Sequence, residues 1–336
     1  MIKRITDIKE YMRMADVEKL PLNYANTIIK NILGQKAVLY NDPWLWHLHL
    51  KVNNACNAKC DFCVEQNSQT RENTEEYLKS VSIMLDEMKR EGILYSVSVT
   101  GGEPTLYSKF AELCELLRSY DIPFLTINTN GSKLRNDEIR NIIDSTFHFV
   151  DVSRHHVDNI KNREIFHFAV PDAEDLFRIK ILLKNAKMRI QCVTADMKSV
   201  EDFIKFKRRF FFADDLSFRR LMKLPDEYGV TYDTNDDIYQ DLLDHAYSHY
   251  HLKEQMIQDY YTYEVWNDEY TDITFSYSNM TFLKRTESIE PDGFFREFII
   301  HPDGVISGSW VDGGRKSKTL YIPMREAIKD ESRRGN

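Results

Sequence analysis

Short runs that alternate apolar and polar residues recur through the middle of the chain, between about residues 44 and 224. Each run precedes a segment with apolar residues on one helical face, such as Tyr77, Val81, Met84 and Met88 after the first run. The runs cover residues 46–52, 96–100, 124–130, 147–153, 188–194 and 216–222. Strands that alternate with helices predict parallel pairing with right-handed crossovers. The expected fold is α/β, as a partial or full barrel or a doubly wound sheet.

The two faces of the predicted strands differ in polarity. In the first run His47, His49 and Lys51 alternate with apolar residues, and later runs repeat this contrast. Buried parallel strands are normally apolar on both faces, and a closed eight-stranded barrel fills its interior with branched apolar side chains. One polar face on strand after strand instead indicates helices over an apolar outside and a wide polar cavity inside. We therefore expect a partial (β/α)6 TIM-like barrel with an open side.

An N-terminal segment, residues 1–43, precedes the expected barrel. Ile28, Ile29, Ile32 and Leu33 form an apolar stripe that Gly34 could end. This spacing predicts peripheral helices before the barrel.

The last part of the chain, residues 225–336, has a different character from the expected barrel at residues 44–224. Residues 238–247 have a helical pattern, and the chain beyond them is rich in aromatic residues. Pro302-Asp-Gly304 is a turn sequence between two short apolar runs, so it predicts a hairpin. We expect a small α+β cap.

Composition excludes several classes of protein. The formal charge is −8, from 45 Lys and Arg and 53 Asp and Glu, which argues against general binding to nucleic-acid backbones. No apolar run approaches the roughly 18 residues of a membrane span. The first residues carry charges where a signal peptide needs an apolar stretch. The expectation is a cytoplasmic protein that does not bind membranes.

Three of the five cysteines, Cys56, Cys60 and Cys63, follow the first predicted strand in a CxxxCxxC pattern. A clustered trio in a reducing compartment indicates a metal site. Structural zinc usually takes four ligands from two separated pairs, which this pattern lacks. A [4Fe–4S] cluster on three cysteines leaves one iron open to a substrate or cofactor. Cys114 and Cys192 stand alone on apolar faces and are expected to pack in the core.

The second predicted strand runs directly into Thr100-Gly-Gly-Glu-Pro-Thr105. Two glycines at a strand end allow another group to approach the backbone closely, and the adjacent carboxylate could hold an ammonium group. The carboxyl ends of parallel strands are also where such folds place their active sites. The cysteine loop and this segment are therefore expected to meet.

The two motifs together resemble the paired signature of the radical S-adenosylmethionine (SAM) superfamily, and Asn128-Thr-Asn-Gly131 after the third strand is also typical of it. The resemblance covers about residues 44–224. The sequence is similar to the branch of this superfamily that contains the molybdenum-cofactor cyclase and the peptide-modifying enzymes. The resemblance implies a [4Fe–4S] cluster that cleaves SAM reductively to a 5′-deoxyadenosyl radical, which then abstracts a substrate hydrogen.

The resemblance also implies roles for individual residues. Cys56, Cys60 and Cys63 would ligate three irons, and SAM would chelate the fourth. Phe62 matches the position beside the adenine, and the segment Gly101, Gly102 and Glu103 matches the one that holds the methionine amine. Four further positions on strands three to six would line the SAM pocket: Asn128, Ser153, Gln191 and Met222.

The C-terminal segment departs from many peptide-modifying relatives, which carry additional clusters in a cysteine-rich domain. This chain has no cysteine after Cys192, and its hairpin offers Gly308 and Ser309 where a cysteine might be expected. The resemblance therefore implies a cap without an auxiliary cluster.

Basic and polar residues on the inward strand faces suggest the kind of substrate. The candidate substrate residues are His47, His49, Lys51, Asp151, Arg154, His155, Arg189 and Arg220, with Arg219 as an alternative to Arg220. Several desolvated cations would be costly unless an anion met them, and arginine suits carboxylate or phosphate recognition. We therefore expect a polar, anionic small molecule or nucleotide as the substrate.

Two alternatives remain open from the sequence. Within the enzyme class, the substrate could be a ribosomal peptide precursor. From another class, the chain could be a non-catalytic iron–sulfur or zinc protein, although a structural metal site does not need the Gly-Gly-Glu-Pro segment. An enzyme of the expected kind also needs an electron donor such as flavodoxin or ferredoxin.

Overall fold

The computed structural model describes residues 27–40, 46–63, 65, 68, 70–221, 238–257, 261–278, 295, 297–310 and 319–323. None of the helices in these ranges combines the length and apolar character that crossing a bilayer requires.

The described N-terminal residues form a β-hairpin, not the expected helix. Strands β1 (Thr27–Ile32) and β2 (Gln35–Tyr40) pair antiparallel around a two-residue turn. Leu33 and Gly34 both have positive φ, 51° and 80°, as a tight hairpin turn of the I′ kind requires. The helical prediction is therefore wrong over residues 27–40. Its stripe of four residues was too short to separate a helix from a strand, and the turn at Leu33 and Gly34 decided between them.

Six parallel strands form the centre of a twelve-stranded sheet, in the order β14-β13-β12-β3-β4-β5-β6-β7-β8-β11-β10-β9. The six are β3 (His47–Lys51), β4 (Ser96–Thr100), β5 (Phe124–Thr129), β6 (Phe149–Ser153), β7 (Lys187–Val193) and β8 (Asp215–Arg219). Each predicted run overlaps one of these strands, with ends that differ by up to three residues. The α/β prediction is confirmed, and the mostly parallel sheet is consistent with a partial TIM-like barrel.

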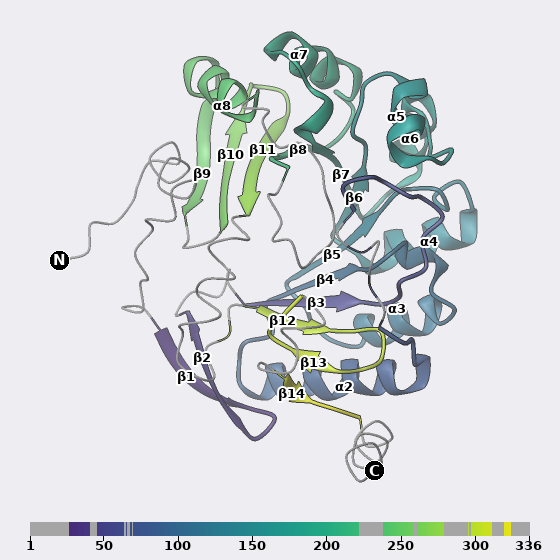
Figure 1. The fold of residues 1–336 in the computed structure, drawn as a ribbon, viewed down its shortest axis with the longest axis vertical. Helices are drawn as coiled ribbons and strands as arrows, with labels where there is room; N and C mark the ends of the chain where they lie inside the picture. The colour runs from purple at the N-terminus through teal and green to yellow at the C-terminus, as the bar shows by residue number, and fades with distance from the viewer. Residues whose placement is uncertain are drawn as a thin grey trace, which may run out of the picture.

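Helices connect these strands and lie along one side of the curved sheet (Figure 1). They are α2 (Thr74–Arg90), α3 (Phe110–Arg118), α4 (Asp137–Thr146), α5 (Asn159–Phe166), α6 (Ala173–Leu182) and α7 (Val200–Arg209), with short 3-10 turns η2 (Pro104–Leu106) and η3 (Thr194–Asp196). Helix α2 begins after Asn73, whose side chain accepts a hydrogen bond from the amide of Glu76. Such N-caps satisfy backbone donors that the helix itself leaves free.

The apolar strand residues face these helices. Leu48, Val97 and Ile190 are fully buried and share one core with Val81 of α2 and Leu113 of α3. The polar residues of the same strands lie on the other face, since the side chains of a strand alternate. The predicted orientation, apolar outward and polar inward, is therefore confirmed. The polar face is called the inner face below.

The C-terminal elements extend both edges of the central sheet. They are α8 (Ile238–His249), β9 (His251–Ile257), β10 (Tyr261–Asn267), β11 (Asp272–Ser278), β12 (Glu297–Ile300), β13 (Ile306–Ser307) and β14 (Thr319–Tyr321). Strand β11 pairs in parallel with β8, and β12 pairs in parallel with β3. The expected helix is α8, and the expected hairpin is formed by β12 and β13. The C-terminal strands belong to the same sheet as the six central strands (Figure 1).

Candidate active site

The loop after β3 is held against the end of β4 by backbone contacts. The amides of Gly102 and Glu103 donate to the carbonyls of Asn53 and Ala55, at 2.9 and 2.7 Å. Gly101 has a φ of +136°, which side chains rarely adopt, and a Cβ on Gly102 would lie 2.3 Å from the oxygen of Ala55. Both positions require glycine, because the loop backbone occupies the space of a side chain. The two glycines thus fix the start of the segment that carries the three clustered cysteines.

The Glu103 carboxylate lies inside the protein and joins its own segment to the end of β5. One oxygen, Oε1, accepts from the amide and hydroxyl of Thr105, at 3.2 and 2.5 Å, and from the hydroxyl of Thr129 at 2.7 Å. The other, Oε2, accepts from the amide of Asn130 at 2.7 Å. Burial raises the pKa of Glu103, although all four donors favour the ionised form. The carboxylate thus fixes the ends of β4 and β5, while its contact with an amine stays a prediction.

The three clustered cysteines lie close enough to affect one another. Burial, followed by the nearby groups of Cys63 and Cys56, raises the pKa of Cys60 to about 12. Burial also raises the pKa of Cys56, whose sulfur accepts from the amide of Ala58 at 3.4 Å. Thiols that resist ionisation beside one another favour a site where a metal centre supplies the missing positive charge.

The arrangement fits a cluster better than a single metal ion. Within the described ranges, no three His, Cys, Asp or Glu side chains gather closely enough to hold one ion. A [4Fe–4S] cluster makes a different demand, since each cysteine binds its own iron. Cys56, Cys60 and Cys63 are the residues that would hold it.

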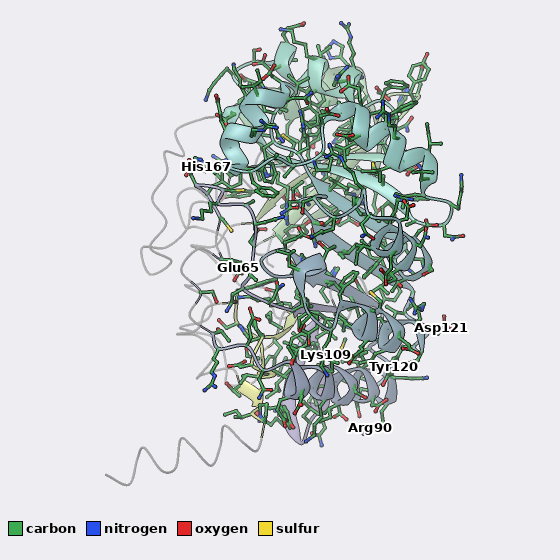
Figure 2. All side chains as sticks on the ribbon, turned by 90° about the vertical axis from the view of Figure 1, so that its right-hand side faces the viewer. Glu65, Arg90, Lys109, Tyr120, Asp121 and His167 are labelled. Carbon is green, nitrogen blue, oxygen red and sulfur yellow. The ribbon has the colours of Figure 1, made fainter. Side chains whose placement is uncertain are left out.

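Contacts on both sides position the cysteine loop. The amide of Lys59 donates to the carbonyl of Phe166 at 2.9 Å, and His167 lies 3.1 Å from Asp61. Lys51, the last residue of β3, is buried and forms an ion pair with Glu65 at 2.9 Å. Figure 2 shows Glu65 and His167 along one side of the molecule, away from Tyr120 and Asp121. The loop is therefore tied to the end of β3 and to the end of α5.

Phe62 lies against a buried stack of rings. Its ring meets His155 edge-on at 5.0 Å, and His155 stacks on Phe166 at 4.9 Å. His155 Nδ1 accepts from the amide of Val193 at 3.1 Å, and burial lowers the pKa of His155 to about 3. His155 is therefore a neutral packing residue in this structure. The structure does not place it with the inner-face residues as a substrate contact.

Arg154 organises the loop after β6. Its guanidinium is almost fully buried and donates to the carbonyls of His156, Val157 and Pro171 and to Oδ1 of Asn159. These four acceptors use its donors inside the protein. The expected contact of Arg154 with substrate is therefore not supported, because its hydrogen bonds already hold the loop.

One of the two histidines on β3, His49, is joined to the C-terminal segment on the inner face. His49 Nε2 lies 3.0 Å from Oε2 of Glu297, and the indole N–H of Trp310 donates to the same carboxylate. The Trp310 ring also packs against His49, at 4.6 Å. Burial alone would raise the pKa of Glu297, but the bonds from His49 and Trp310 hold it below its ordinary value. His47 contacts the hydroxyl of Ser96 at 2.9 Å.

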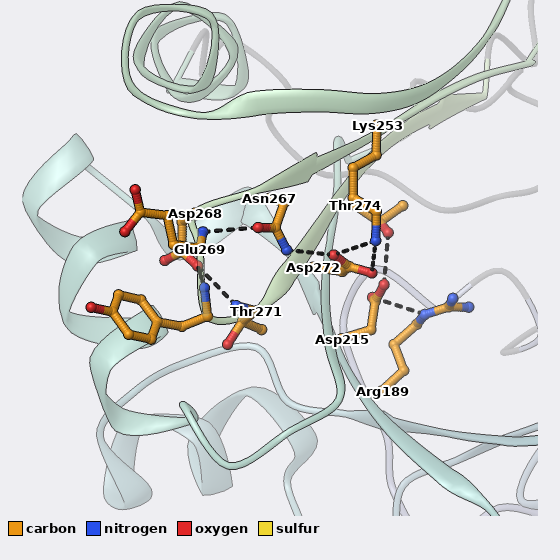
Figure 3. Close-up of polar contacts among 10 residues, drawn as sticks. Arg189, Asp215, Lys253, Asn267, Asp268, Glu269, Thr271, Asp272 and Thr274 are labelled. Carbon is orange, nitrogen blue, oxygen red and sulfur yellow. Dashed lines mark hydrogen bonds and ion pairs between the residues drawn. The ribbon is translucent and has the colours of Figure 1, made fainter.

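Arg189 lies between two buried carboxylates on the other half of the inner face, Asp215 and Asp151, and Figure 3 shows its contact with Asp215. Its Nε donates to Asp215 at 2.9 Å, and its Nη1 lies 3.6 Å from Oδ1 of Asp151. Asp215 also accepts from the hydroxyl of Thr274 on β11 at 3.0 Å. Burial alone would lower the pKa of Arg189, but the two carboxylates hold it above its ordinary value. Burial raises the pKa of Asp151, and the charge of Asp215 adds to that effect.

These pairs correct the expectation of a basic cavity. The cations Lys51 and Arg189, like His49, are each met by a carboxylate of the protein: Glu65 for Lys51, Asp151 and Asp215 for Arg189, and Glu297 for His49. Their burial therefore needs no anionic ligand. The anionic substrate can no longer be argued from these three residues.

The remaining predicted site residues divide between the two faces. Asn128 donates to the hydroxyl of Ser98 on the inner face, at 2.9 Å. Ser153 and Gln191 pair in register on β6 and β7, and their contact with a cofactor stays a prediction. Arg220 instead lies over the ring of Tyr277, at 5.0 Å, so it is not placed with the inner-face residues. Met222 lies outside the described residues.

Sequence reasoning missed the partners that complete these contacts: Glu65, Thr129, Asp215, Glu297 and Trp310. The sequence could have indicated Asp215, because it lies two residues before Ser217 and therefore on the same face of the strand. Glu297 and Trp310 carry no such signal, since nothing in the local pattern says that β12 pairs with β3.

Comparison with protein families gives a match over the middle of the chain. The model described as the Radical SAM superfamily matches residues 50–210. This range contains the cysteine loop, the Gly101–Glu103 segment and strands β4 to β7.

Curated relatives match about one third of the chain. A GTP 3′,8-cyclase of Haemophilus influenzae (strain 86-028NP) is 30% identical over 114 residues, which are 32% of this chain and 33% of that protein. A GTP 3′,8-cyclase of Mannheimia succiniciproducens is 29% identical over 116 residues, with the same shares. The chain spans about a third of the length of the curated relatives that it matches.

Solved structures share the fold over most of the chain. Streptococcus suis SuiB bound to S-adenosylmethionine has a TM-score of 0.58 at 19% identity, covering 84% of this chain and 65% of that one. The protein anSMEcpe with bound AdoMet has a TM-score of 0.52 at 17% identity, covering 84% and 80%. At these identities the likeness concerns the fold alone.

Proposed function

Since residues 50–210 make this chain a member of the radical SAM superfamily, we propose that it is an enzyme that cleaves SAM reductively and abstracts hydrogen from a polar substrate. When bound, the [4Fe–4S] cluster and SAM supply a 5′-deoxyadenosyl radical. The observation that carries the proposal is the contact between the two motifs. The glycines of the Gly101–Glu103 segment hold the loop of Cys56, Cys60 and Cys63 at the carboxyl ends of β3 and β4.

The chain's own residues would bind and orient the reactants. The three cysteines would hold the cluster, and Phe62 would lie beside the adenine. Gly101 to Glu103 would hold the methionine amine of SAM, with Ser153 and Gln191 under the bound molecule. The buried rings of His155 and Phe166 support Phe62 from below. Fixed surroundings of this kind orient the reactants and exclude water.

The substrate would lie over the inner face, where every central strand carries polar side chains. We propose a small polar molecule or nucleotide as the substrate class. The curated relatives named GTP 3′,8-cyclase agree with a nucleotide, though the match covers a third of their length. A flavodoxin or ferredoxin would supply the electron.

A peptide precursor is the second candidate. The supporting observation is that SuiB, whose fold matches 84% of this chain, has also been solved bound to its precursor peptide SuiA. The two candidates differ in one measurable respect, because only the true substrate class should raise the rate of SAM cleavage.

The test is anaerobic reconstitution with iron and sulfide, followed by reduction in the presence of SAM. Wild-type protein should form 5′-deoxyadenosine, detected by mass spectrometry. Cys60→Ala should lose the iron–sulfur absorbance near about 400 nm and the product, because its thiolate holds one iron. Cys192→Ala is the matched control: this thiol is fully buried, donates to the carbonyl of His155 at 3.6 Å, and should leave both signals unchanged.

An absence of 5′-deoxyadenosine from fully reconstituted wild-type protein would favour a non-catalytic iron–sulfur protein instead. A stable cluster in Cys60→Ala would overturn the ligand assignment. Candidate nucleotides and short peptides, added in turn to the active protein, then decide between the two substrate classes.

A further inference from the structure

The inner face has two levels that differ in how their polar groups are satisfied. At the lower level the protein meets its own charges, as Arg189 with Asp151 and Asp215 and His49 with Glu297 illustrate. The upper level lies at the carboxyl ends of the parallel strands, where sites of such folds are found. The groups of the upper level therefore lie where a substrate would bind.

Among the described residues, three polar side chains of the upper level have no partner. Ser153, Gln191 and Arg219 are partly exposed, and within the described ranges their side chains form no hydrogen bond or ion pair. Lys51 is the last residue of β3, but Glu65 already neutralises it at 2.9 Å. Of the upper-level cations in the described part of the chain, Arg219 alone keeps all its donors.

Strand register places Arg219 on the inner face. Asp215, Ser217 and Arg219 alternate along β8, and the first two pair with Arg189 and Gln191 of β7. All of these positions therefore share one face of the sheet. The charge of Arg219 also lowers the pKa of Asp151, against the larger effect of burial, as expected for groups that face the same interior.

The neighbouring arginine has the other orientation. Arg220 follows the end of β8 and lies over the Tyr277 ring at 5.0 Å. Tyr277 pairs in register with Thr262, whose side chain is fully buried on the outer face. Two adjacent arginines thus point to opposite sides of one strand end, and only Arg219 faces the substrate region.

The chemistry of a free guanidinium defines its ligand. It is always charged and offers donors in a planar fork that matches a carboxylate or a phosphate. The charge of Arg219 also offsets part of the charge of Asp151 at a distance. This long-range effect uses none of the hydrogen-bond donors of Arg219. A partly buried arginine with unused donors is therefore suited to bind the oxygens of a carboxylate or a phosphate.

We infer that Arg219 binds the carboxylate or phosphate group of the substrate at the upper level of the inner face. The inference rests on the proposed function, since it assumes that the substrate lies over this face. It attributes recognition of the anionic group of the substrate to one residue. The expected basic cavity of several residues is replaced by a single anchor.

The test titrates reconstituted, SAM-loaded protein with inorganic pyrophosphate and with citrate, as phosphate and carboxylate probes. Arg219→Gln should weaken binding of at least one probe about 10- to 100-fold, the range for a hydrogen bond to a charged group. Arg219→Lys should bind the probes with an affinity between those of wild type and Arg219→Gln, because lysine keeps the charge but lacks the planar set of donors. Arg220→Gln is the matched control and should bind like wild type.

A second measurement separates the substrate from SAM itself. SAM affinity and substrate-independent formation of 5′-deoxyadenosine should change less than about twofold in Arg219→Gln, because the anion sought belongs to another molecule. A parallel loss of SAM affinity would overturn the inference by assigning Arg219 to the SAM carboxylate. Equal probe binding by wild type and Arg219→Gln, including no binding by either, would also overturn it.

The two proposals fail in different ways. If wild-type protein binds the probes through Arg219 but forms no 5′-deoxyadenosine, the anion site stands and the proposed reaction fails. If wild-type protein cleaves SAM and the probes do not distinguish Arg219→Gln, the reaction stands and the anion site fails.

Discussion

Glu103→Gln tests whether the carboxylate of the Gly-Gly-Glu-Pro segment serves the fold or a ligand. Glutamine keeps one oxygen, and that oxygen can serve only one side of the present arrangement. If it takes the place of Oε1, the amide nitrogen faces the N–H of Asn130. If it takes the place of Oε2, the amide of Thr105 loses its acceptor. In either case one buried backbone N–H is left without a partner.

The expected magnitude follows from that lost bond. A hydrogen bond to a charged group contributes about 1.5–3 kcal/mol, and a buried donor without an acceptor costs a similar amount. Glu103→Gln should therefore lower the free energy of unfolding by about 1.5–3 kcal/mol. Urea unfolding of the cluster-free protein, followed by circular dichroism, measures this change.

Glu112→Gln is the matched control. Glu112 lies on α3 with 60% of its side chain exposed, and it forms a surface ion pair with Lys109 at 3.3 Å. Such pairs contribute little, so the control should stay within about 0.5 kcal/mol of wild type. An unchanged free energy of unfolding in Glu103→Gln would refute the structural role. A loss of SAM affinity would support the proposed contact of the carboxylate with the amine of SAM.

Two further predictions concern the loop and the ring stack. Gly102→Ala should cost about 1–3 kcal/mol and reduce the iron bound after reconstitution, because the new methyl group meets the carbonyl of Ala55; Gly92→Ala, which has a positive φ but open space, should keep its iron. His155 has a pKa of about 3 in the fold against about 6.5 unfolded, so the unfolded state binds the extra proton and stability falls as pH falls through this window. Between pH 6 and 5, His155→Gln should lose about 1 kcal/mol less stability per pH unit than wild type in urea titrations, and equal slopes would contradict a buried neutral imidazole.

The strands and their two faces could be predicted from sequence because both depend on local alternation. The run at 96–100 matches β4, and the polar residues of β3, His47 and His49, lie on the inner face as expected. The hairpin at residues 27–40 was missed because four apolar residues fit a helix and a strand equally well. Its turn, with two residues of positive φ, could not be recognised from Leu33 and Gly34 alone.

The electrostatics of the site could be predicted only in part. Alternation identified the cations of the inner face, but their partners come from other segments. Glu297 is about 250 residues from His49 along the chain, and it reaches His49 only because β12 pairs with β3. A sequence pattern shows which residues share a strand face. It does not show which distant strand will lie beside it, and this decided whether the cations needed a ligand.

The addition of C-terminal strands to both edges of the sheet has a consequence for biosynthesis. Strand β3 is made early, yet its outer neighbour β12 begins only at Glu297, and the neighbour of β8, β11, begins at Asp272. During translation both edges of the parallel sheet therefore expose unpaired backbone groups until the last fifth of the chain emerges. Open edges can pair with other chains, and contacts between distant segments form slowly. Until β11 and β12 have been made, both edges are therefore open to pairing with other chains.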